Sequence, residues 1–441
     1  MTPRSLLRAM MPQSLSEQVA ICTSEVLLRP LQLLIAYPSF WFLAALTAML
    51  LRHPDVRFYE IDRVAFGLLV LAVVSRAIVL RQPLLVIERA TWPMLGLTLL
   101  ALIGLTGQPF DAEAWSVLAS KLIVPFALFH LAQFVFTSEK HLQQFEVFAV
   151  LVLAYLSFTA IAFLVGARWL IFPRFILDES LGIQADRARG PLLQAVANGV
   201  SINMLGLLAL HAFRRKKGRN IILGLLLASV PVAILATMTR AVWLSFAGTL
   251  MALVLFSESR QVRHAFLAWT IVAAIGFGLV LSSSSLGRAL SDRLEERGPV
   301  EFRQAVYAAS WEMFLERPWT GWGFHQMPSE LPRYVSGYKE KVFYPHNTYL
   351  ELLAEHGIGG LLLYAWLMWE MWQLGRGDIP SGERDGFLDQ QFHRLWPILL
   401  AVYWVNAAVV VMSYQFVNGL LFMMAGMLAA QRRRAKGVAS C

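Results

Sequence analysis

Charged residues are scarce in this sequence: only 15% of its 441 residues are Asp, Glu, Lys or Arg, whereas soluble domains carry about a quarter. This shortage excludes an ordinary soluble protein, and a mean hydropathy of +0.56 indicates a membrane protein. Cysteine is nearly absent as well, because Cys22 and Cys441 stand near the two ends without metal or redox spacing. The sequence contains no D-x-D motif and no histidine cluster, so we expect neither a metal nor another cofactor.

Long apolar runs account for most of the chain. Because about 20 apolar residues cross a bilayer, these runs predict an all-α polytopic membrane protein with about 12 transmembrane helices. The predicted spans are 33–51, 64–80, 92–107, 115–136, 145–166, 190–213, 220–239, 240–256, 264–281, 350–373, 395–413 and 414–431. The chain then divides into spans within 33–281, one long loop at 282–349, and further spans within 350–431.

Positive charge predicts the side on which each loop lies. Clusters of Arg and Lys indicate cytoplasmic segments at 214–219, 260–263 and 432–436. Both ends are then cytoplasmic, with 1–32 as an amphipathic leader that lacks a signal-peptide core and 432–441 as a basic tail. The loop at 282–349 becomes periplasmic, and its eight Lys and Arg residues favour an anionic substrate. We therefore attribute the net charge of +9 to topology and phospholipid contacts, and expect no nucleic-acid partner.

The segment 344–360 reads YPHNTYLELLAEHGIGG and places polar residues directly before a long apolar helix. His346 and Asn347 follow a proline and are expected to approach the helix in an extended conformation. Thr348 and Glu351 form a T-x-x-E pattern, which predicts a capping box at the helix start. A helix N-terminus favours anions, and a histidine with a pKa of about 6.5 can take a proton from a hydroxyl. We therefore expect chemistry at His346, at the outer end of this span.

This segment also resembles a known family. The pattern H-N-x9-G-x-x-G, from His346 to Gly360, is similar to the signature of the O-antigen ligase and polymerase superfamily, which includes bacterial protein O-oligosaccharyltransferases. The upstream P-W-T-G-W-G at 318–323 resembles the P-x-x-G-x-G segment of those proteins, and the resemblance extends over the C-terminal two thirds of the chain. It implies metal-independent transfer of a glycan from undecaprenyl diphosphate to an acceptor hydroxyl, at the periplasmic face of the bacterial inner membrane.

The resemblance also implies roles for several arginines. Arg240, in M-T-R-A-V-W, matches the family's arginine at the start of a helix, and Arg303 matches an arginine ahead of a tryptophan. Arg189 partly matches an R-x-x-G pattern, for which Arg187 is the alternative. A guanidinium group binds two phosphate oxygens at once, in a bidentate manner, and stays charged at every relevant pH. We therefore expect Arg189, Arg240 and Arg303 to hold the diphosphate as it leaves.

The remaining roles concern the acceptor and the support of the site. His346 would activate or orient the acceptor, and Asn347 would support the histidine. The residues expected to help shape the site are Glu351, Gly321, Gly323, Gly357 and Gly360. Lys121 lies within a predicted span near its end, so we expect its side chain to snorkel to the membrane surface.

The long loop contains one predicted helix, at 300–316, which is amphipathic and ends before Pro318. We expect it to lie on the outer membrane surface. Its expected apolar side consists of Val306, Tyr307, Trp311, Phe314 and Leu315.

The motifs do not identify the acceptor. A lipid A–core sugar (ligase), the end of another repeat unit (polymerase) and a protein hydroxyl all fit, and we favour the ligase by a small margin. A transporter or flippase of lipid-linked sugars is the alternative from another class, because it too would use arginines on the outer side. That alternative predicts an internal repeat and broken helices with charges near mid-membrane. This sequence instead concentrates its polarity at one face.

Overall fold

A computed structural model of the chain describes residues 34–53, 59–182, 184–216, 220–255, 267, 270–271, 298–335 and 345–439. All regular elements among these residues are helices, which confirms the all-α class. The longer helices are α3 (Pro38–Leu50), α4 (Tyr59–Val79), α5 (Thr91–Thr106), α6 (Ala112–Leu118), α7 (Val124–Val135), α8 (Glu139–Leu164), α9 (Ala195–Arg215), α10 (Ile221–Ala236), α11 (Arg240–Leu255), α14 (Gly298–Glu316), α16 (Thr348–Leu374), α17 (Gln390–Ala407) and α18 (Gln415–Ala439). The short turns are η2 (Ala119–Ile123), η3 (Arg168–Leu170), η4 (Arg174–Leu177), α15 (Met327–Glu330), η5 (Leu331–Arg333) and η6 (Ser381–Glu383).

Among the described residues, four helices are long and apolar enough to cross a membrane: α6 to α7 taken with η2, α8, α9 and α16. The helices α3, α5, α10 and α11 are apolar but shorter. Each predicted span coincides with a helix except 264–281, which falls almost entirely outside the described residues. The chain is therefore a helical membrane protein, and the number of twelve spans stays a prediction.

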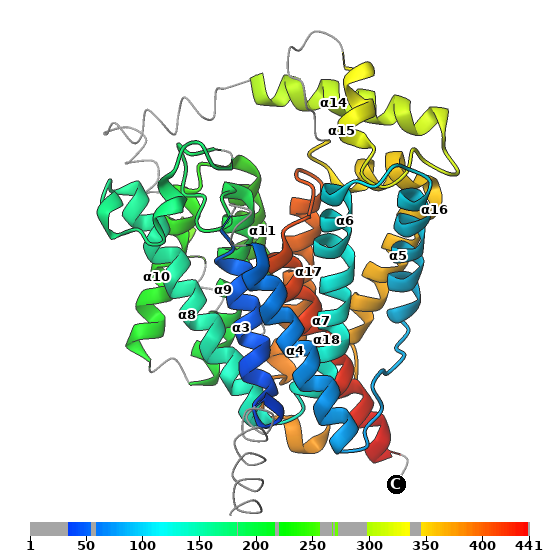
Figure 1. The fold of residues 1–441 in the computed structure, drawn as a ribbon. Helices are drawn as coiled ribbons and strands as arrows, with labels where there is room; N and C mark the ends of the chain where they lie inside the picture. The colour runs from blue at the N-terminus through cyan, green and yellow to red at the C-terminus, as the bar shows by residue number, and fades with distance from the viewer. Residues whose placement is uncertain are drawn as a thin grey trace, which may run out of the picture.

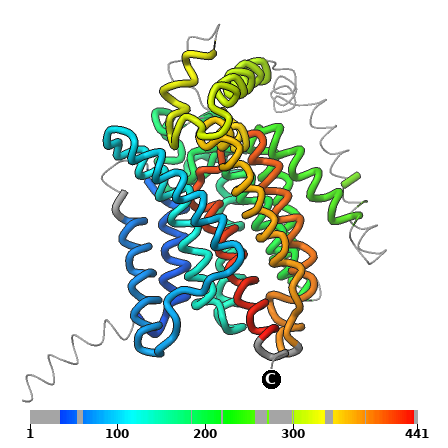
Figure 2. The backbone as a smooth tube through the Cα atoms, turned by 90° about the vertical axis from the view of Figure 1, so that its right-hand side faces the viewer, coloured from blue at the N-terminus to red at the C-terminus, as the bar shows by residue number. Residues whose placement is uncertain are grey.

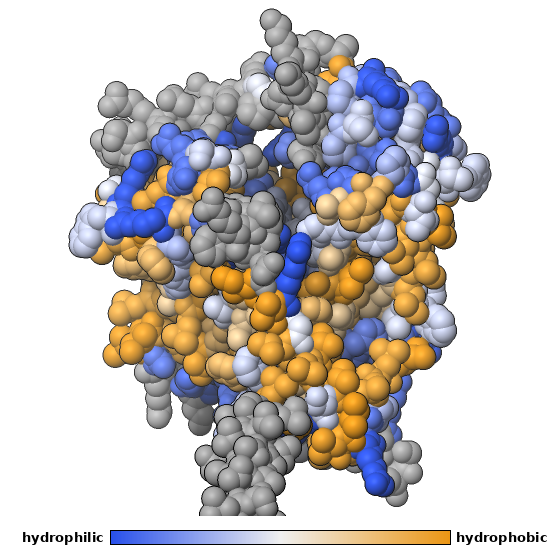
Figure 3. All heavy atoms as spheres, in the orientation of Figure 1, coloured by the Kyte–Doolittle hydropathy of each residue, from blue (hydrophilic) through white to orange (hydrophobic). Residues whose placement is uncertain are grey.

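The helices form an upright bundle, and α14 lies across its upper end (Figure 1). The view turned by 90° shows the same arrangement, with α14 above the ends of the upright helices (Figure 2). Hydrophobic residues form a band around the middle of the visible face, and hydrophilic residues lie above it (Figure 3). Such a band is what a bilayer core requires of the surface that it covers.

The helix α18 is the centre of the bundle, since its residues 416–431 are all buried. It packs along α7, where a side chain at Gly426 would place its Cβ only 2.3 Å from the Phe129 carbonyl oxygen. Small residues allow this close approach of two helix backbones, because within a membrane tight packing replaces the hydrophobic effect between helices.

Ion pairs hold the lower end of the bundle, where the C-terminus lies (Figure 1). Arg215 lies 3.1 Å from Glu139 and 2.6 Å from Glu146, and Arg434 lies 2.7 Å from Glu383. Two of the basic clusters expected on the cytoplasmic side, those that contain Arg215 and Arg434, therefore lie at the same end of the bundle.

The predicted helix of the long loop is α14, and it packs against the protein through only part of its expected apolar side. Trp311 and Leu315 of that side are 47% and 58% exposed. The buried residues are Val306, Ala309, Ser310 and Met313. They pack against α15, η5 and Ala354 of α16, so contacts with other parts of the chain decide which side is covered. The helix is thereby fixed onto the start of α16.

Candidate functional site

The start of α16 differs by one residue from the predicted capping box. Asn347 is the N-cap, and its Oδ1 accepts hydrogen bonds from the N–H groups of Tyr349 (2.9 Å) and Leu350 (3.2 Å). The predicted cap by Thr348 with Glu351 is therefore wrong. Because Asn347 already pairs with these N–H groups, the side chains of Thr348 and Glu351 are available for tertiary contacts.

Thr348 fastens the start of α16 to the connection between α17 and α18. Its Oγ1 donates to the Val410 carbonyl and accepts from the Met412 N–H, both at 3.0 Å. The side chain is buried, so both of its hydrogen bonds are shielded from water. The histidine two residues earlier is therefore attached to a rigid part of the bundle.

His346 is held in an unusual backbone conformation, with φ of 46° in the left-handed region, so the extended conformation predicted for it is wrong, whereas Asn347 is extended as predicted. Its carbonyl oxygen lies 3.1 Å from the Tyr307 hydroxyl of α14, and the Phe302 ring lies edge-on with its centroid 6.3 Å from that of the imidazole. Burial lowers the pKa of His346, and the positive charge of Arg303 lowers it further. The imidazole is therefore uncharged at neutral pH and able to accept a proton.

The helix α16 is interrupted at Gly357, where φ is 64° and ψ is −164°. Three backbone hydrogen bonds join the segment 318–323 to the interruption: Trp322 N–H to Ala354 C=O (2.8 Å), Gly323 N–H to Glu355 C=O (2.9 Å) and Ile358 N–H to Pro318 C=O (2.8 Å). Backbone groups that the broken helix leaves unpaired are thus satisfied by another part of the chain, as an apolar setting demands. The two motifs of the sequence analysis therefore form one structural unit.

Glycines at the interruption have positive φ or almost no space for a side chain. Gly321 has φ of 65°, and a Cβ there would lie 2.3 Å from the Glu355 carbonyl oxygen. A Cβ at Gly357 would lie 2.5 Å from the Pro318 carbonyl oxygen. Gly323 (φ 102°) and Gly360, whose Cβ would lie 2.3 Å from that of His356, border the same place.

Gly321→Ala is expected to lower the free energy of unfolding by about 1–3 kcal/mol, because alanine is strained at positive φ and its Cβ would collide with α16. Denaturant unfolding of the purified protein in mixed micelles measures the change. Gly359→Ala is the matched control, since Gly359 is helical and a Cβ there meets nothing within 4 Å. Unchanged stability of Gly321→Ala would contradict the tight pairing of 318–323 with α16.

Arg240 is the first residue of α11, as the sequence predicts. In the next turns of α11, the Ser245 hydroxyl accepts a hydrogen bond from the Asn406 amide of α17 at 2.8 Å. The end of α17 in turn contacts the site, because the Ala408 carbonyl oxygen lies 3.2 Å from the Tyr307 hydroxyl. The starts of α11 and α16 therefore lie at the same end of the bundle.

Arg189, predicted to contact the diphosphate, makes structural hydrogen bonds within the preceding loop. The residue is only 1% exposed. Its guanidinium donates to three backbone carbonyls of the preceding loop: Nε to Ile176 (3.0 Å), Nη1 to Leu181 and Nη2 to Asp178. The alternative residue, Arg187, is 15% exposed and lies 3.6 Å from the Asp186 carboxylate.

Lys121, Glu351 and Glu355 form a charged cluster beside the interruption that the sequence did not predict. Lys121, on the π-helical turn η2, is 8% exposed, and its ammonium group pairs with the Glu351 carboxylate. Glu355 is 2% exposed and accepts a hydrogen bond from the His325 N–H at 2.9 Å. The prediction that Lys121 snorkels to the membrane surface is therefore wrong. Such π-helical turns are frequent at functional sites.

One signal in the sequence could have revealed this cluster. Glu351 and Glu355 are four residues apart, which places both carboxylates on one face of an apolar helix and requires a cation opposite them. Among the described residues, no three His, Cys, Asp or Glu side chains are placed to share a metal ion.

Comparison with known proteins agrees with the motifs. Residues 222–365, about a third of the chain, match the family model described as O-Antigen ligase. The matched segment includes Arg240, Arg303 and His346, and this finding confirms the expected resemblance to the O-antigen ligase superfamily. No curated protein matches the chain.

Proposed function

We propose that this chain transfers a glycan from undecaprenyl diphosphate to an acceptor hydroxyl, and the match of residues 222–365 to the O-antigen ligase family model supports the proposal. The observation that carries this proposal is the surrounding of His346. Its imidazole is uncharged, lies beside Arg303 and directly precedes a helix N-terminus. A base next to cationic groups is what a transfer with a diphosphate leaving group needs.

In the proposed reaction, the acceptor oxygen attacks the anomeric carbon of the glycan. The bond from that carbon to the diphosphate oxygen breaks, and its electron pair leaves with undecaprenyl diphosphate. His346 takes or orients the acceptor proton, and Asn347 keeps it in place by capping α16. Arg240 and Arg303 stabilise the charge that develops on the diphosphate. This scheme requires no metal.

The site is proposed to face the periplasm of a bacterial inner membrane. Basic clusters on both α9 and α18 lie at the lower end, which the positive-inside rule assigns to the cytoplasm. The starts of α11 and α16 lie at the opposite end. A lipid A–core sugar remains the favoured acceptor over a repeat unit or a protein hydroxyl.

One observation favours the alternative of a lipid-linked sugar transporter. The helix α16 is interrupted, and Lys121 and Glu355 are buried beside it together with the half-buried Glu351, which are features expected of transporters. The function test must therefore separate bond breakage from lipid movement.

The deciding experiment uses the purified protein in detergent with undecaprenyl-diphosphate-linked glycan and each of the three acceptors. Free undecaprenyl diphosphate and glycosylated acceptor are measured together. We expect both to appear with one acceptor, which identifies the branch. Binding of the lipid without bond breakage, combined with movement of that lipid across liposome membranes, would establish the transporter instead.

Arg240→Gln is expected to reduce the rate of transfer about 10²–10³-fold, the typical cost of removing one preorganised group from a developing charge. Arg240→Lys is expected to recover part of the rate, because lysine keeps the charge but loses the planar fork. Arg76→Gln is the control: this arginine lies near the other end of the bundle, where it donates to the Ile35 carbonyl at 3.3 Å. Wild-type rates in Arg240→Gln would remove Arg240 from the site.

A further inference from the structure

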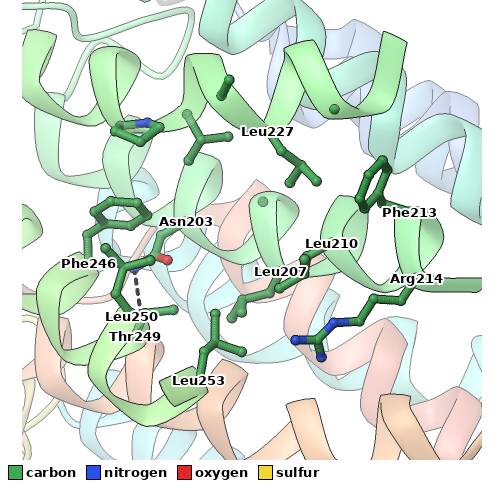
Figure 4. A pocket seen from close by; sticks show the side chains of 15 residues that line it. Asn203, Leu207, Leu210, Phe213, Arg214, Leu227, Phe246, Thr249, Leu250 and Leu253 are labelled. Atoms are coloured by element: carbon green, nitrogen blue, oxygen red, sulfur yellow. Dashed lines mark hydrogen bonds between the residues drawn. The ribbon is translucent and has the colours of Figure 1, made fainter. Parts of the chain in front are cut away.

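An apolar cavity of about 480 Å³ lies between α9, α10 and α11, below the start of α11. Its walls are mainly apolar, and Figure 4 shows leucine and phenylalanine side chains converging on the cavity from all three helices. The leucine and phenylalanine side chains that line it include Leu207, Leu210, Phe213, Leu227, Leu250 and Leu253. A volume of this size with apolar walls and few polar groups is typical of a ligand site.

The cavity has the depth of one leaflet. It extends from Asn203, whose amide bonds Thr249 at 3.2 Å, to Arg214 near the end of α9. At 1.5 Å per residue, these two positions on α9 are about 16 Å apart. Half of a hydrocarbon core about 30 Å thick is of the same length. A single acyl chain of the leaflet at the lower end therefore fits the cavity along its length.

The charge of the cavity lies at one end only. Arg214 lines it at the lower end of α9, and Figure 4 shows its guanidinium extending back beneath Leu207 toward Leu253. The opposite end holds no charged residue among the lining residues. Because a phosphate would bind where the guanidinium lies, the headgroup of the ligand belongs at the lower end. The donor lipid proposed above would carry its diphosphate at the upper end.

The α10 side of the region faces lipid. Ile221, Ile222 and Leu225 on this helix are 77%, 78% and 68% exposed, so bilayer chains can contact the outer side of the helix that forms one wall. A lipid from the bilayer can therefore reach this wall without passing through water. Basic pockets between transmembrane helices on the cytoplasmic side bind anionic lipid headgroups in other membrane proteins.

We propose that this cavity binds an anionic phospholipid of the leaflet at the lower end, with one acyl chain between α9, α10 and α11 and its phosphate on Arg214. Occupancy would fix α10 and α11 against α9. Since α11 begins with Arg240, the lipid would also stabilise the element that carries a proposed diphosphate ligand. The binding itself does not depend on the proposed reaction.

The test uses the full chain in mixed micelles that contain either dioleoylphosphatidylglycerol or dioleoylphosphatidylcholine. Native mass spectrometry counts retained lipid, and thermal unfolding reports stabilisation by the bound lipid. We expect retention and a higher unfolding temperature with phosphatidylglycerol. Arg214→Gln is expected to weaken that binding about fivefold, and Leu227→Trp, which fills the cavity, to abolish it. Lys140→Gln, an exposed lysine at the same end on α8, serves as the control and is expected to bind as the wild type does.

Three results would overturn the proposal. Equal retention of both phospholipids would show that the cavity does not require an anionic headgroup. Unchanged binding in Arg214→Gln would show that Arg214 does not bind the phosphate. Displacement of phosphatidylglycerol by undecaprenyl phosphate in the wild type, combined with retention of undecaprenyl phosphate that is unaffected by Arg214→Gln but abolished by Leu227→Trp, would assign the cavity to the polyprenyl tail of the donor.

Discussion

His346→Ala is expected to reduce glycan transfer by about 10²–10⁴-fold, the usual contribution of a positioned general base, while binding of the donor lipid is retained. The physical reason is that no other described imidazole lies beside Arg303 at the start of α16. Release of undecaprenyl diphosphate by purified protein measures the rate, and retention of the labelled lipid measures binding.

The backbone at His346 requires a second variant, because alanine is strained at φ of 46°. His346→Asn tolerates the left-handed conformation, so a loss of transfer in this variant as well is chemical and not conformational. His325→Asn is the control, since His325 also has positive φ (62°) and its described hydrogen bond is made by the backbone N–H, which the substitution keeps. Transfer at the wild-type rate in His346→Asn would show that His346 is not the base.

The pH profile separates a base from a positioning residue. Burial and Arg303 both lower the pKa of His346, so the uncharged form persists below pH 6.5 and the acid limb of kcat/KM lies below that value. Arg303→Gln removes the second cause, and we expect the acid limb to move toward neutral pH. An acid limb that does not move would indicate that His346 only orients the acceptor.

Lys121→Met is expected to lower the free energy of unfolding by about 3–5 kcal/mol, the typical cost of removing one partner from a buried ion pair. The Glu351 carboxylate, at 12% side-chain exposure and with Glu355 close by, would lose its cationic partner. Denaturant unfolding in mixed micelles measures the loss. The start of α16 is capped by Asn347, directly after His346, so a displaced α16 would also displace the proposed base. The rate of transfer by the remaining folded protein is therefore expected to fall as well.

The double variant Lys121→Met with Glu351→Gln tests the origin of that loss. If the cost comes from an unpaired carboxylate, Glu351→Gln restores much of the stability that Lys121→Met loses. The double-mutant cycle of these two substitutions then gives a large interaction energy. Lys140→Met, at an exposed position on α8, is the control and is expected to change stability little. Wild-type stability of Lys121→Met would show that the buried pair does not hold α16.

By itself, the sequence determined the class of the protein and the places of its helices. Scarce charge and long apolar runs are sufficient for this, because the bilayer imposes length and hydrophobicity on each helix separately. The motif around His346 likewise revealed the resemblance to the O-antigen ligase superfamily and placed the histidine just before a helix start. These conclusions rest on neighbours along the chain.

Only the tertiary structure decided which side chains meet. Asn347 caps α16 because its own backbone is extended and the helix begins at the next residue. The T-x-x-E pattern contains no information on these backbone angles. Arg189 binds loop carbonyls that only the folded loop brings together. Lys121 pairs with a glutamate 230 residues away, so no local pattern could have shown that it is buried. Such contacts are decided by how the helices pack, because a charge in an apolar setting must find its partner wherever the fold places it.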